Sequence, residues 1–325
     1  MRISLLLLLA CAACSSPQKA PEGPKVAFLL STLQEERYQK DKAGFEAAAK
    51  KLGLAAFTLA ADNDNAKQLA QVEDALARGA KVLVIQPTDS AAAAAYVDKA
   101  HEKGAKVVAY DRNISGKPDF YVAHDSHRVG VLQAEAAVKA TGGKGKYVLL
   151  LGQSGHSVAR EIARGYMDVL RPYVDRKEIE IAVEKSHDAW SPEQALKTVE
   201  DAFAKTKGDV AAILANNSGM ARGAVQAAQA AGKTPFIAGA DADAANVSLV
   251  CEGKQSIEVL KAIQPLAEKA AEVASALARN QRVAGATAGD VPTVAVAVDA
   301  VTRENARKLL VGSGFHPASA LPACP

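Results

Sequence analysis

The amino-acid sequence predicts an α/β protein built from two doubly wound parallel-sheet lobes. Short, continuously apolar runs recur along the chain, as is typical of strands buried on both faces of a parallel sheet. Segments with apolar residues at helical spacing separate these runs, and such strand–helix alternation indicates parallel sheets. The pattern occurs twice within 325 residues, without a dinucleotide-binding fingerprint. We therefore expect two similar lobes that face each other across a cleft.

The first lobe opens with an apolar run at residues 25–30, which predicts a strand. A helix is expected over residues 36–52, because Phe45 and Leu52 lie on one helical face and Gly53 is a typical stop. Further strands are expected at 55–59, 82–85, 107–110 and 120–123, and further helices over 69–76 and 91–103.

The pattern restarts after residue 123 and predicts a second lobe of similar size. Strands are expected at 147–151, 179–183, 210–214 and 236–238, with helices over 129–140, 158–170, 192–204 and 221–231. A helix over 263–279 and one strand at 293–298 complete the set. This alternation again predicts a doubly wound sheet.

Residues 1–24 have the features of a lipoprotein-type signal peptide followed by a tether. Arg2 supplies a positive start, and the apolar run at 3–10 is far too short to span a bilayer. Small residues with a cysteine follow, which predicts lipidation at Cys14, with Cys11 as the alternative, or else a plain secretory signal. The protein is therefore expected in the periplasm or at the cell surface, with membrane contact only through a lipid anchor.

The composition is that of an ordinary globular protein, with 49% hydrophobic and 23% charged residues. The formal net charge is only +3, and no basic run is interleaved with aromatic residues, so a nucleic-acid partner is not expected. Beyond the signal, the cysteines are Cys251 and Cys324. Export permits a disulfide, but the sequence leaves open whether these two residues meet.

Motifs that resemble catalytic or metal sites are incomplete. Residues 152–156 lie between a strand and a helix, but they lack the second glycine of a nucleophile elbow, which argues against a hydrolase based on Ser154. Residues 142–145 precede a strand and lack the Lys-Ser/Thr ending of a phosphate-binding loop. The histidines are scattered, without metal-ligand spacing. We expect no enzymatic activity, no metal and no cofactor.

Polar side chains gather at the predicted carboxyl ends of the strands. Asp111 and Arg112 directly follow the strand at 107–110, and ligands of open α/β sheets bind beyond such strand ends. Sugars present hydroxyls and an apolar C–H face, which planar charged groups and an aromatic ring match. Taken singly, each residue is equally a cap, a surface ion pair or a core aromatic, so the prediction of a sugar site depends on their coincidence. The other members of the set are Glu36, Arg37, Arg160, Trp190, Asn217, Asp241 and Lys261.

Six segments carry a resemblance to a known family. They are Glu36-Arg37-Tyr38-Gln39-Lys40-Asp41, Ala109-Tyr110-Asp111-Arg112, Val129-Gly130 with Leu132-Gln133-Ala134, Asp188-Ala189-Trp190-Ser191-Pro192-Glu193, Asp241-Ala242-Asp243 and Gly314-Phe315-His316. Over about residues 25–321 the chain resembles the periplasmic substrate-binding proteins of bacterial sugar ABC importers, most closely their xylose-binding members. The resemblance implies the type I fold of that family, whose two lobes are joined by a three-strand hinge and close on the ligand between them.

The resemblance also implies where the lobes begin and end. The N-terminal sugar-binding lobe is expected to comprise residues 25–124 and 259–290, and the C-terminal lobe residues 125–258 and 291–325. The chain is then expected to cross between the lobes near 123–125, 256–261 and 291–294.

The resemblance implies a role for each polar residue. In the family, the residues matching Arg37, Asp111, Arg112, Asn217, Asp241 and Lys261 hydrogen-bond the sugar, and the aromatic matching Trp190 stacks on it. Arg160 resembles an arginine that ribose-type relatives use, and Glu36 is expected either as an additional contact or as a partner of a contact residue. The implied function is capture of D-xylose, or a closely related aldose, for delivery to the membrane permease of an ABC importer. A sensor that presents the sugar to a chemoreceptor or histidine kinase is the alternative.

The sequence also departs from the family pattern beside the predicted contacts. Ser126, Ser218 and Ala240 stand where the family has Asn, Asp and Gln. The charged contacts are kept while flanking polar groups are lost, so a pentose or hexose remains the expected ligand and its identity stays open.

Overall fold

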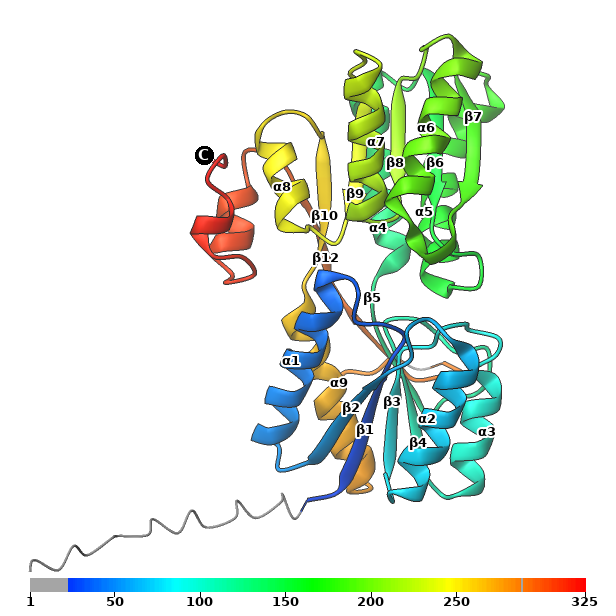
Figure 1. The fold of residues 1–325 in the computed structure, drawn as a ribbon, viewed down its shortest axis with the longest axis vertical. Helices are drawn as coiled ribbons and strands as arrows, with labels where there is room; N and C mark the ends of the chain where they lie inside the picture. The colour runs from blue at the N-terminus through cyan, green and yellow to red at the C-terminus, as the bar shows by residue number, and fades with distance from the viewer. Residues whose placement is uncertain (1–22, 288) are drawn as a thin grey trace, which may run out of the picture.

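A computed structural model describes residues 23–287 and 289–325, and the predicted signal with Cys11 and Cys14 lies outside these residues. The chain forms two α/β lobes that lie one above the other (Figure 1). Each lobe is organised around one six-stranded sheet. The predicted fold class, two parallel-sheet α/β lobes, is confirmed.

The first lobe contains sheet A, in which all neighbouring strands are parallel. Its strand order is β11 (Thr293–Val296), β5 (Phe120–His124), β4 (Lys106–Tyr110), β3 (Val82–Ile85), β1 (Lys25–Leu30) and β2 (Ala55–Ala60). The helices of this lobe are α1 (Glu36–Lys51), α2 (Asn65–Ala77), α3 (Ala94–Glu102) and α9 (Ile263–Ala278).

The second lobe contains sheet B, which is parallel apart from the antiparallel edge strand β12. Its strand order is β12 (Val298–Val301), β10 (Ile257–Lys261), β9 (Phe236–Ala240), β8 (Ala212–Ala215), β6 (Gly145–Leu151) and β7 (Ile179–Ser186). The helices of this lobe are α4 (Ser126–Thr141), α5 (Ser157–Asp175), α6 (Pro192–Thr206), α7 (Ser218–Ala230) and α8 (Ala244–Cys251), with helical turns at Asp188–Trp190, Arg307–Val311 and Ala318–Ala320.

Three connections join the lobes, and two of them differ from the expected boundaries. The first lies between β5 and α4, at Asp125. The second follows Lys261, because β10 pairs with strands of sheet B to its last residue; residues 259–261 therefore belong to the second lobe. The third is at Ala297, because β11 pairs with β5; residues 291–296 therefore lead into and form part of the first lobe.

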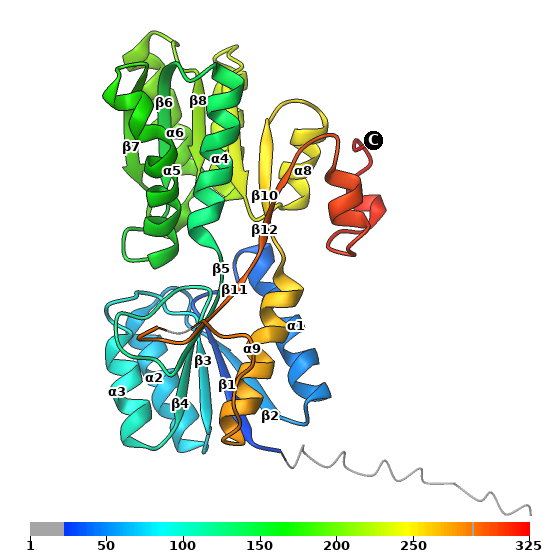
Figure 2. The same cartoon turned by 180° about the vertical axis from the view of Figure 1, so that it is seen from behind.

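The predicted strand at 293–298 is in fact two strands in two different sheets. β11 pairs with β5 in the first lobe, and β12 pairs with β10 in the second. Only Ala297 separates them, and both strands read as one continuous run in the sequence, which is why a single strand was predicted. Figure 2 shows this run passing between the lobes beside β5.

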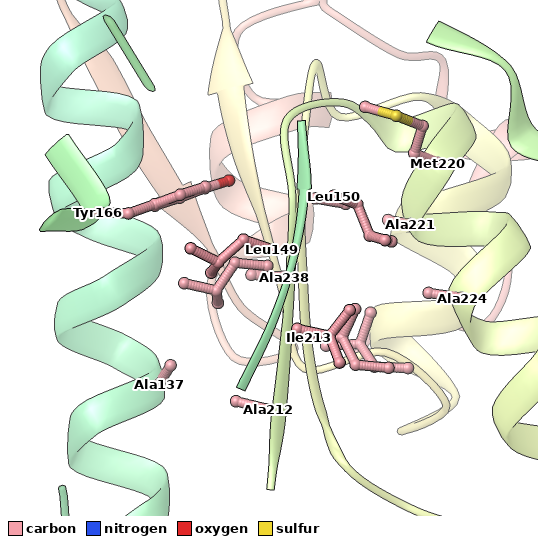
Figure 3. Packing of buried hydrophobic residues seen from close by; sticks show 14 of the residues in the cluster. Ala137, Leu149, Leu150, Tyr166, Ala212, Ile213, Met220, Ala221, Ala224 and Ala238 are labelled. Carbon is pink, nitrogen blue, oxygen red and sulfur yellow. The ribbon is translucent and has the colours of Figure 1, made fainter. Parts of the chain in front are cut away.

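The core of the second lobe lies on both faces of sheet B. Consecutive residues of a strand point to opposite faces, and in Figure 3 Leu149 lies toward Tyr166 while Leu150 lies toward Met220 and Ala221. These residues are buried. Burial on both faces accounts for the continuous apolar runs that predicted a parallel sheet.

A disulfide joins Cys251 at the end of α8 to Cys324 near the C-terminus. It fastens the C-terminal segment to the second lobe, where Leu310 and Leu321 pack in one apolar cluster with Ala242. The structure thus settles the pairing that the sequence left open. Within the described part of the chain, none of the helices combines the length and apolar character needed to cross a bilayer.

Helices α4 and α5 touch at two glycines. A Cβ atom at Gly130 would lie 2.0 Å from the carbonyl oxygen of Ile162, and one at Gly165 would lie 2.2 Å from that of His127. Such contacts are with backbone, so relief requires the two helices to separate. The glycines therefore set the spacing between α4 and α5.

We expect Gly130→Ala to destabilise the protein by about 1–3 kcal/mol through overpacking. Helix propensity alone would favour Ala over Gly by up to about 1 kcal/mol, so the sign of the change reports the close contact. Urea unfolding measures the difference, with the exposed Glu135→Ala on the same helix as the control. A stabilised Gly130→Ala protein would contradict the close packing.

Candidate functional site

A cavity of about 520 Å³ lies between the lobes, and both lobes line it. It is formed where β4, β9 and β10 end and where α1 and α7 begin. Parallel strands present their carboxyl ends at one edge of each sheet, where ligands of open α/β sheets bind. The predicted residues that line it are Glu36, Arg37, Asp111, Arg112, Trp190, Asn217, Asp241 and Lys261.

The Arg37 guanidinium is the centre of the charged groups in this cavity. Its Nη2 lies 3.1 Å from Asp111 Oδ1, its Nη1 lies 3.2 Å from Asp241 Oδ1, and its Nε lies 3.4 Å from Asp41 Oδ2. Burial opposes the charge of Arg37, but these carboxylates outweigh burial and raise the arginine pKa further above its ordinary value. We call these four residues the Arg37 cluster. It joins the first lobe to the second through Asp241.

Asp111 is the buried carboxylate that pairs with Arg37 within the first lobe. Burial opposes its charge, but Arg37 and Lys261 outweigh this effect and hold its pKa well below the usual range. Gln86 Nε2 donates to its second oxygen at 3.3 Å. His124 Nδ1 lies 3.8 Å from its first oxygen, and burial lowers the histidine pKa, which favours the neutral ring. Asp111 is therefore an ionised acceptor in a fixed position.

Asp241 connects the cluster to the hinge. Its Oδ1 also lies 3.1 Å from Lys261 Nζ, and Lys261 is the last residue of β10, directly before the second crossing. Because Asp241 accepts from one cation of each lobe, the angle between the lobes and the geometry of the cavity are linked.

The backbone at the site adopts conformations that non-glycine residues seldom use. The φ angles are +59° at Asp111, +100° at Asp241, +51° at Ala189 and +58° at Trp190. Such conformations cost roughly 1–3 kcal/mol each and persist only where the surroundings impose them. The four residues follow β4, β7 and β9, and all of them line the cavity.

Trp190 is nearly buried and is oriented by His156. The indole Nε1 donates to His156 Nδ1 at 2.7 Å, and His156 Nε2 donates to the Thr88 carbonyl of the first lobe at 2.7 Å. This arrangement requires a neutral imidazole, and burial together with Arg112 lowers the pKa of His156 to about 3. The aromatic ring is therefore locked in place by a contact that spans both lobes.

The segment that resembled a nucleophile elbow holds this tryptophan instead. A Cβ atom at Gly152 would lie 2.5 Å from the Trp190 ring, so glycine is needed for the ring to lie flat against the backbone. Ser154 is exposed, and its carbonyl accepts from Arg160 Nη1 at 2.9 Å. Aromatic packing thus accounts for the glycine in this segment, for which the sequence already argued against a nucleophile elbow.

Arg160 was predicted to contact the ligand, but the structure places it elsewhere. Its side chain is exposed, and Val158 lines the cavity from α5 in its place. Two positions along a helix rotate a side chain by about 200°, so Val158 and Arg160 face opposite ways. The helical phase of α5 therefore turns Arg160 away from the cavity in this structure.

Residues beside Arg37 also line the cavity, although the sequence interpretation missed them. The Tyr38 hydroxyl accepts from Arg112 Nη2 at 2.8 Å. Glu35 has a buried Oε2 without a hydrogen-bond partner among the described residues, and burial raises its pKa. Glu36, in contrast, lies at the exposed rim and pairs with Lys40 at 2.8 Å. Glu35 and Tyr38 lie at the start of helix α1, which begins at Glu36. The predicted start of this helix was therefore the signal that could have identified them.

The second lobe adds a structural ion pair and a helix cap. Arg222 Nη1 lies 3.2 Å from Asp243 Oδ2 and donates to Asn246 Oδ1 at 2.6 Å. Asn217 Oδ1 caps α7 by accepting from the Met220 N–H at 2.9 Å, so the NH2 group of Asn217 is the part that can donate to a ligand.

The loop that carries Asp241 rests on a buried carboxyl group. Glu258 Oε2 accepts from the Ala242 N–H at 3.1 Å and from the Ser218 hydroxyl at 2.8 Å. Burial raises the pKa of Glu258 to about 8. Ser218, one of the departures from the family pattern, thus contacts this support and does not line the cavity.

Comparison with known proteins places the chain in a family. The periplasmic binding protein domain matches residues 26–282. The chain belongs to this family. The D-xylose-binding periplasmic protein of Escherichia coli K12 is 34% identical over 331 residues, which cover 99% of this chain and 100% of that protein. The resemblance deduced from the six sequence segments is therefore confirmed.

Solved structures of similar proteins share the fold. A carbohydrate transporter solute-binding protein of Chloroflexus aurantiacus, in complex with D-glucose, is 31% identical with a TM-score of 0.85 and covers 92% of this chain and 98% of its own. An ABC transporter solute-binding protein of Clostridium phytofermentans, with bound β-D-glucose, is 26% identical with a TM-score of 0.86 and covers 91% and 99%.

The raised pKa of Glu258 predicts how stability depends on pH. The unfolded carboxyl has a pKa near 4.5, so its protonation stabilises the fold fully below that pH. This contribution is lost as the pH rises through about 8. We expect the free energy of unfolding of the Glu258→Gln variant to fall less between pH 5 and pH 8 than that of the wild type, by more than about 1 kcal/mol.

Urea unfolding at the two pH values measures this difference, and the exposed Glu252→Gln is the control. Equal slopes for the wild type and Glu258→Gln would contradict the assignment.

Proposed function

We propose that the protein captures D-xylose, or a closely related aldose, in the cavity between its lobes and delivers it to the permease of an ABC importer. The observation that carries this proposal is the Arg37 cluster, which places oriented donors and acceptors from both lobes beside a fixed tryptophan. No catalytic step is required, because binding and lobe closure are sufficient for delivery. The proposed location is outside the inner membrane.

The pairing of charges favours a neutral, hydroxyl-rich ligand. Arg37 and Lys261 both face Asp241, and Arg222 faces Asp243. These three cations already have carboxylate partners, so an anionic ligand would have to displace one of them or pair with Arg112, whose guanidinium donates to the Pro87 carbonyl and the Tyr38 hydroxyl. A hydroxyl, in contrast, both donates and accepts and can add to a charged pair without separating it.

The aromatic ring favours a pyranose. Trp190 lines the cavity, and its indole N–H is occupied by His156, so the ring face is what it offers to a ligand. The C–H face of a pyranose supplies a matching apolar surface. The buried Glu35 Oε2 has an unfilled place for one more donor, which a ligand hydroxyl would fill.

The relatives support this range of ligands. The Escherichia coli relative is named for D-xylose, and the Chloroflexus aurantiacus structure holds D-glucose. The two sugars differ by one hydroxymethyl group. We therefore propose D-xylose as the preferred ligand and D-glucose as the second candidate.

Titration with sugars tests the proposal directly, because Trp190 is the single tryptophan of the chain. We expect a saturable change of tryptophan fluorescence with D-xylose or D-glucose, and none with xylonate. A sugar at about a thousandfold excess over Kd should stabilise the protein by about 4 kcal/mol, which a thermal melt detects as a rise in Tm. Absence of both responses for every aldose would refute the proposed ligand class.

Removal of one carboxylate tests the site. Asp241→Ala should weaken binding by one to two decades, because a hydrogen bond to a charged group contributes about 1.5–3 kcal/mol. Arg160→Ala is the matched control, since this exposed arginine lies outside the cavity, and its Kd should equal that of the wild type. The same fluorescence titration measures both. The site would be misassigned if Arg160→Ala weakened binding and Asp241→Ala did not.

A further inference from the structure

The Gly314-Phe315-His316 segment does not line the cavity, yet it contacts the loop that does. His316 is 3% exposed, and its Nε2 lies 2.7 Å from the carbonyl oxygen of Ala242. A carbonyl oxygen only accepts, so Nε2 carries the proton and donates it. Ala242 directly follows Asp241, the carboxylate shared by the Arg37 cluster and Lys261. The C-terminal segment thus holds the backbone next to a ligand-facing residue.

Two side chains fix Ala242 from opposite sides. Glu258 accepts its N–H at 3.1 Å, and His316 donates to its carbonyl at 2.7 Å. The φ angles of Asp241 and Ala242 are +100° and +57°. A non-glycine residue keeps such angles only where its surroundings impose them, and these two hydrogen bonds supply that constraint.

The neighbouring residue contacts the other lobe. Lys40 Nζ lies 4.7 Å from the centroid of the Phe315 ring, and both residues line a cavity of about 350 Å³ together with Ala43 and Gly44 of α1. Lys40 lies one helical turn after Arg37 on the same helix. Phe315 and His316 therefore contact the elements that carry both partners of the Arg37–Asp241 ion pair.

The segment is fastened on both sides of Phe315 and His316. Cys324 is bonded to Cys251, and Leu321 and Leu310 are buried in the cluster that includes Ala242. Figure 1 shows the C-terminal segment beside α8 and close to the first turns of α1. A segment held in this way can transmit its position to the Asp241 loop.

We propose that residues 302–325 act as a clamp on the binding site and that His316 is the positioning residue for Asp241. His316 does not touch the ligand. It sets the backbone from which Asp241 reaches Arg37 and Lys261, while Phe315 holds α1 at the matching distance. The expected effect of His316 on affinity rests on the proposed function. The expected effect of His316 on the Asp241 loop is independent of any ligand.

The test compares two substitutions of one residue. His316→Leu removes the donor and keeps the volume, and we expect it to weaken the Kd for the preferred aldose about tenfold. His316→Gln restores a donor at the position of Nε2 and should recover most of the affinity. Leu170→Ala, a fully buried residue at the far end of α5, controls for loss of stability, and we expect its Kd to be unchanged.

Hydrogen exchange of the ligand-free protein measures how firmly the Asp241 loop is held. The amides of residues 241–243 should exchange faster in His316→Leu than in the wild type, beyond any increase in Leu170→Ala. If no aldose binds the wild type, the proposed function fails while this measurement still decides the clamp. Unchanged exchange at 241–243 in His316→Leu, or a Kd within about twofold of the wild type, would overturn the proposal.

The Cys251–Cys324 disulfide gives a second test, which asks whether its loss and the loss of the His316 side chain have additive effects on affinity. The double variant Cys251→Ser with Cys324→Ser should weaken binding in the same direction as His316→Leu. Combined with His316→Leu it should add little, because both changes release the same contact. If the losses of affinity from the two changes were fully additive, the disulfide would act elsewhere, and its proposed role in holding His316 would be overturned.

Discussion

The buried guanidinium of Arg37 imposes the arrangement of the whole site. An arginine with 6% exposure is costly unless carboxylates and hydrogen bonds replace its water. Asp41 comes from the same helix, Asp111 from the end of β4, and Asp241 from the end of β9 in the other lobe. The requirement to neutralise one cation therefore brings three separate elements to one point.

The same requirement links recognition to lobe movement. Asp241 is shared between Arg37 and Lys261, and Lys261 ends the strand that leads into the second crossing. The Trp190–His156–Thr88 connection joins the lobes at a second place. A change in the angle between the lobes must alter both connections, so a ligand that contacts the same residues favours one angle over others.

Much of this architecture could be predicted from the sequence, for a physical reason. Strands buried on both faces are recognisable as apolar runs, and residues directly after them meet at one edge of the sheet. Asp111, Asp241 and Lys261 were found in this way. The signal is local, and it locates strand ends well.

What the sequence did not reveal depends on geometry that no local pattern records. The position of Arg160 depended on the helical phase of α5, which only the packing determines. The third crossing has no turn residue, because Ala297 lies within a continuous apolar run. The partner of Trp190 is His156, 34 positions away. Each of these features is set by tertiary contacts.

The three crossings also have a consequence for the order in which the protein can fold as it is made. Helix α9 packs Leu266, Ala267 and Ala270 into the core of the first lobe, although the second lobe is encoded before it. The N-terminal lobe therefore cannot complete its core until α9 and Val294 of β11, which belongs to the same apolar cluster, have been synthesised. The lobe whose strands are made first therefore cannot be completed before the strands of the second lobe up to β10 have been made, and its segments stay accessible to chaperones in the meantime.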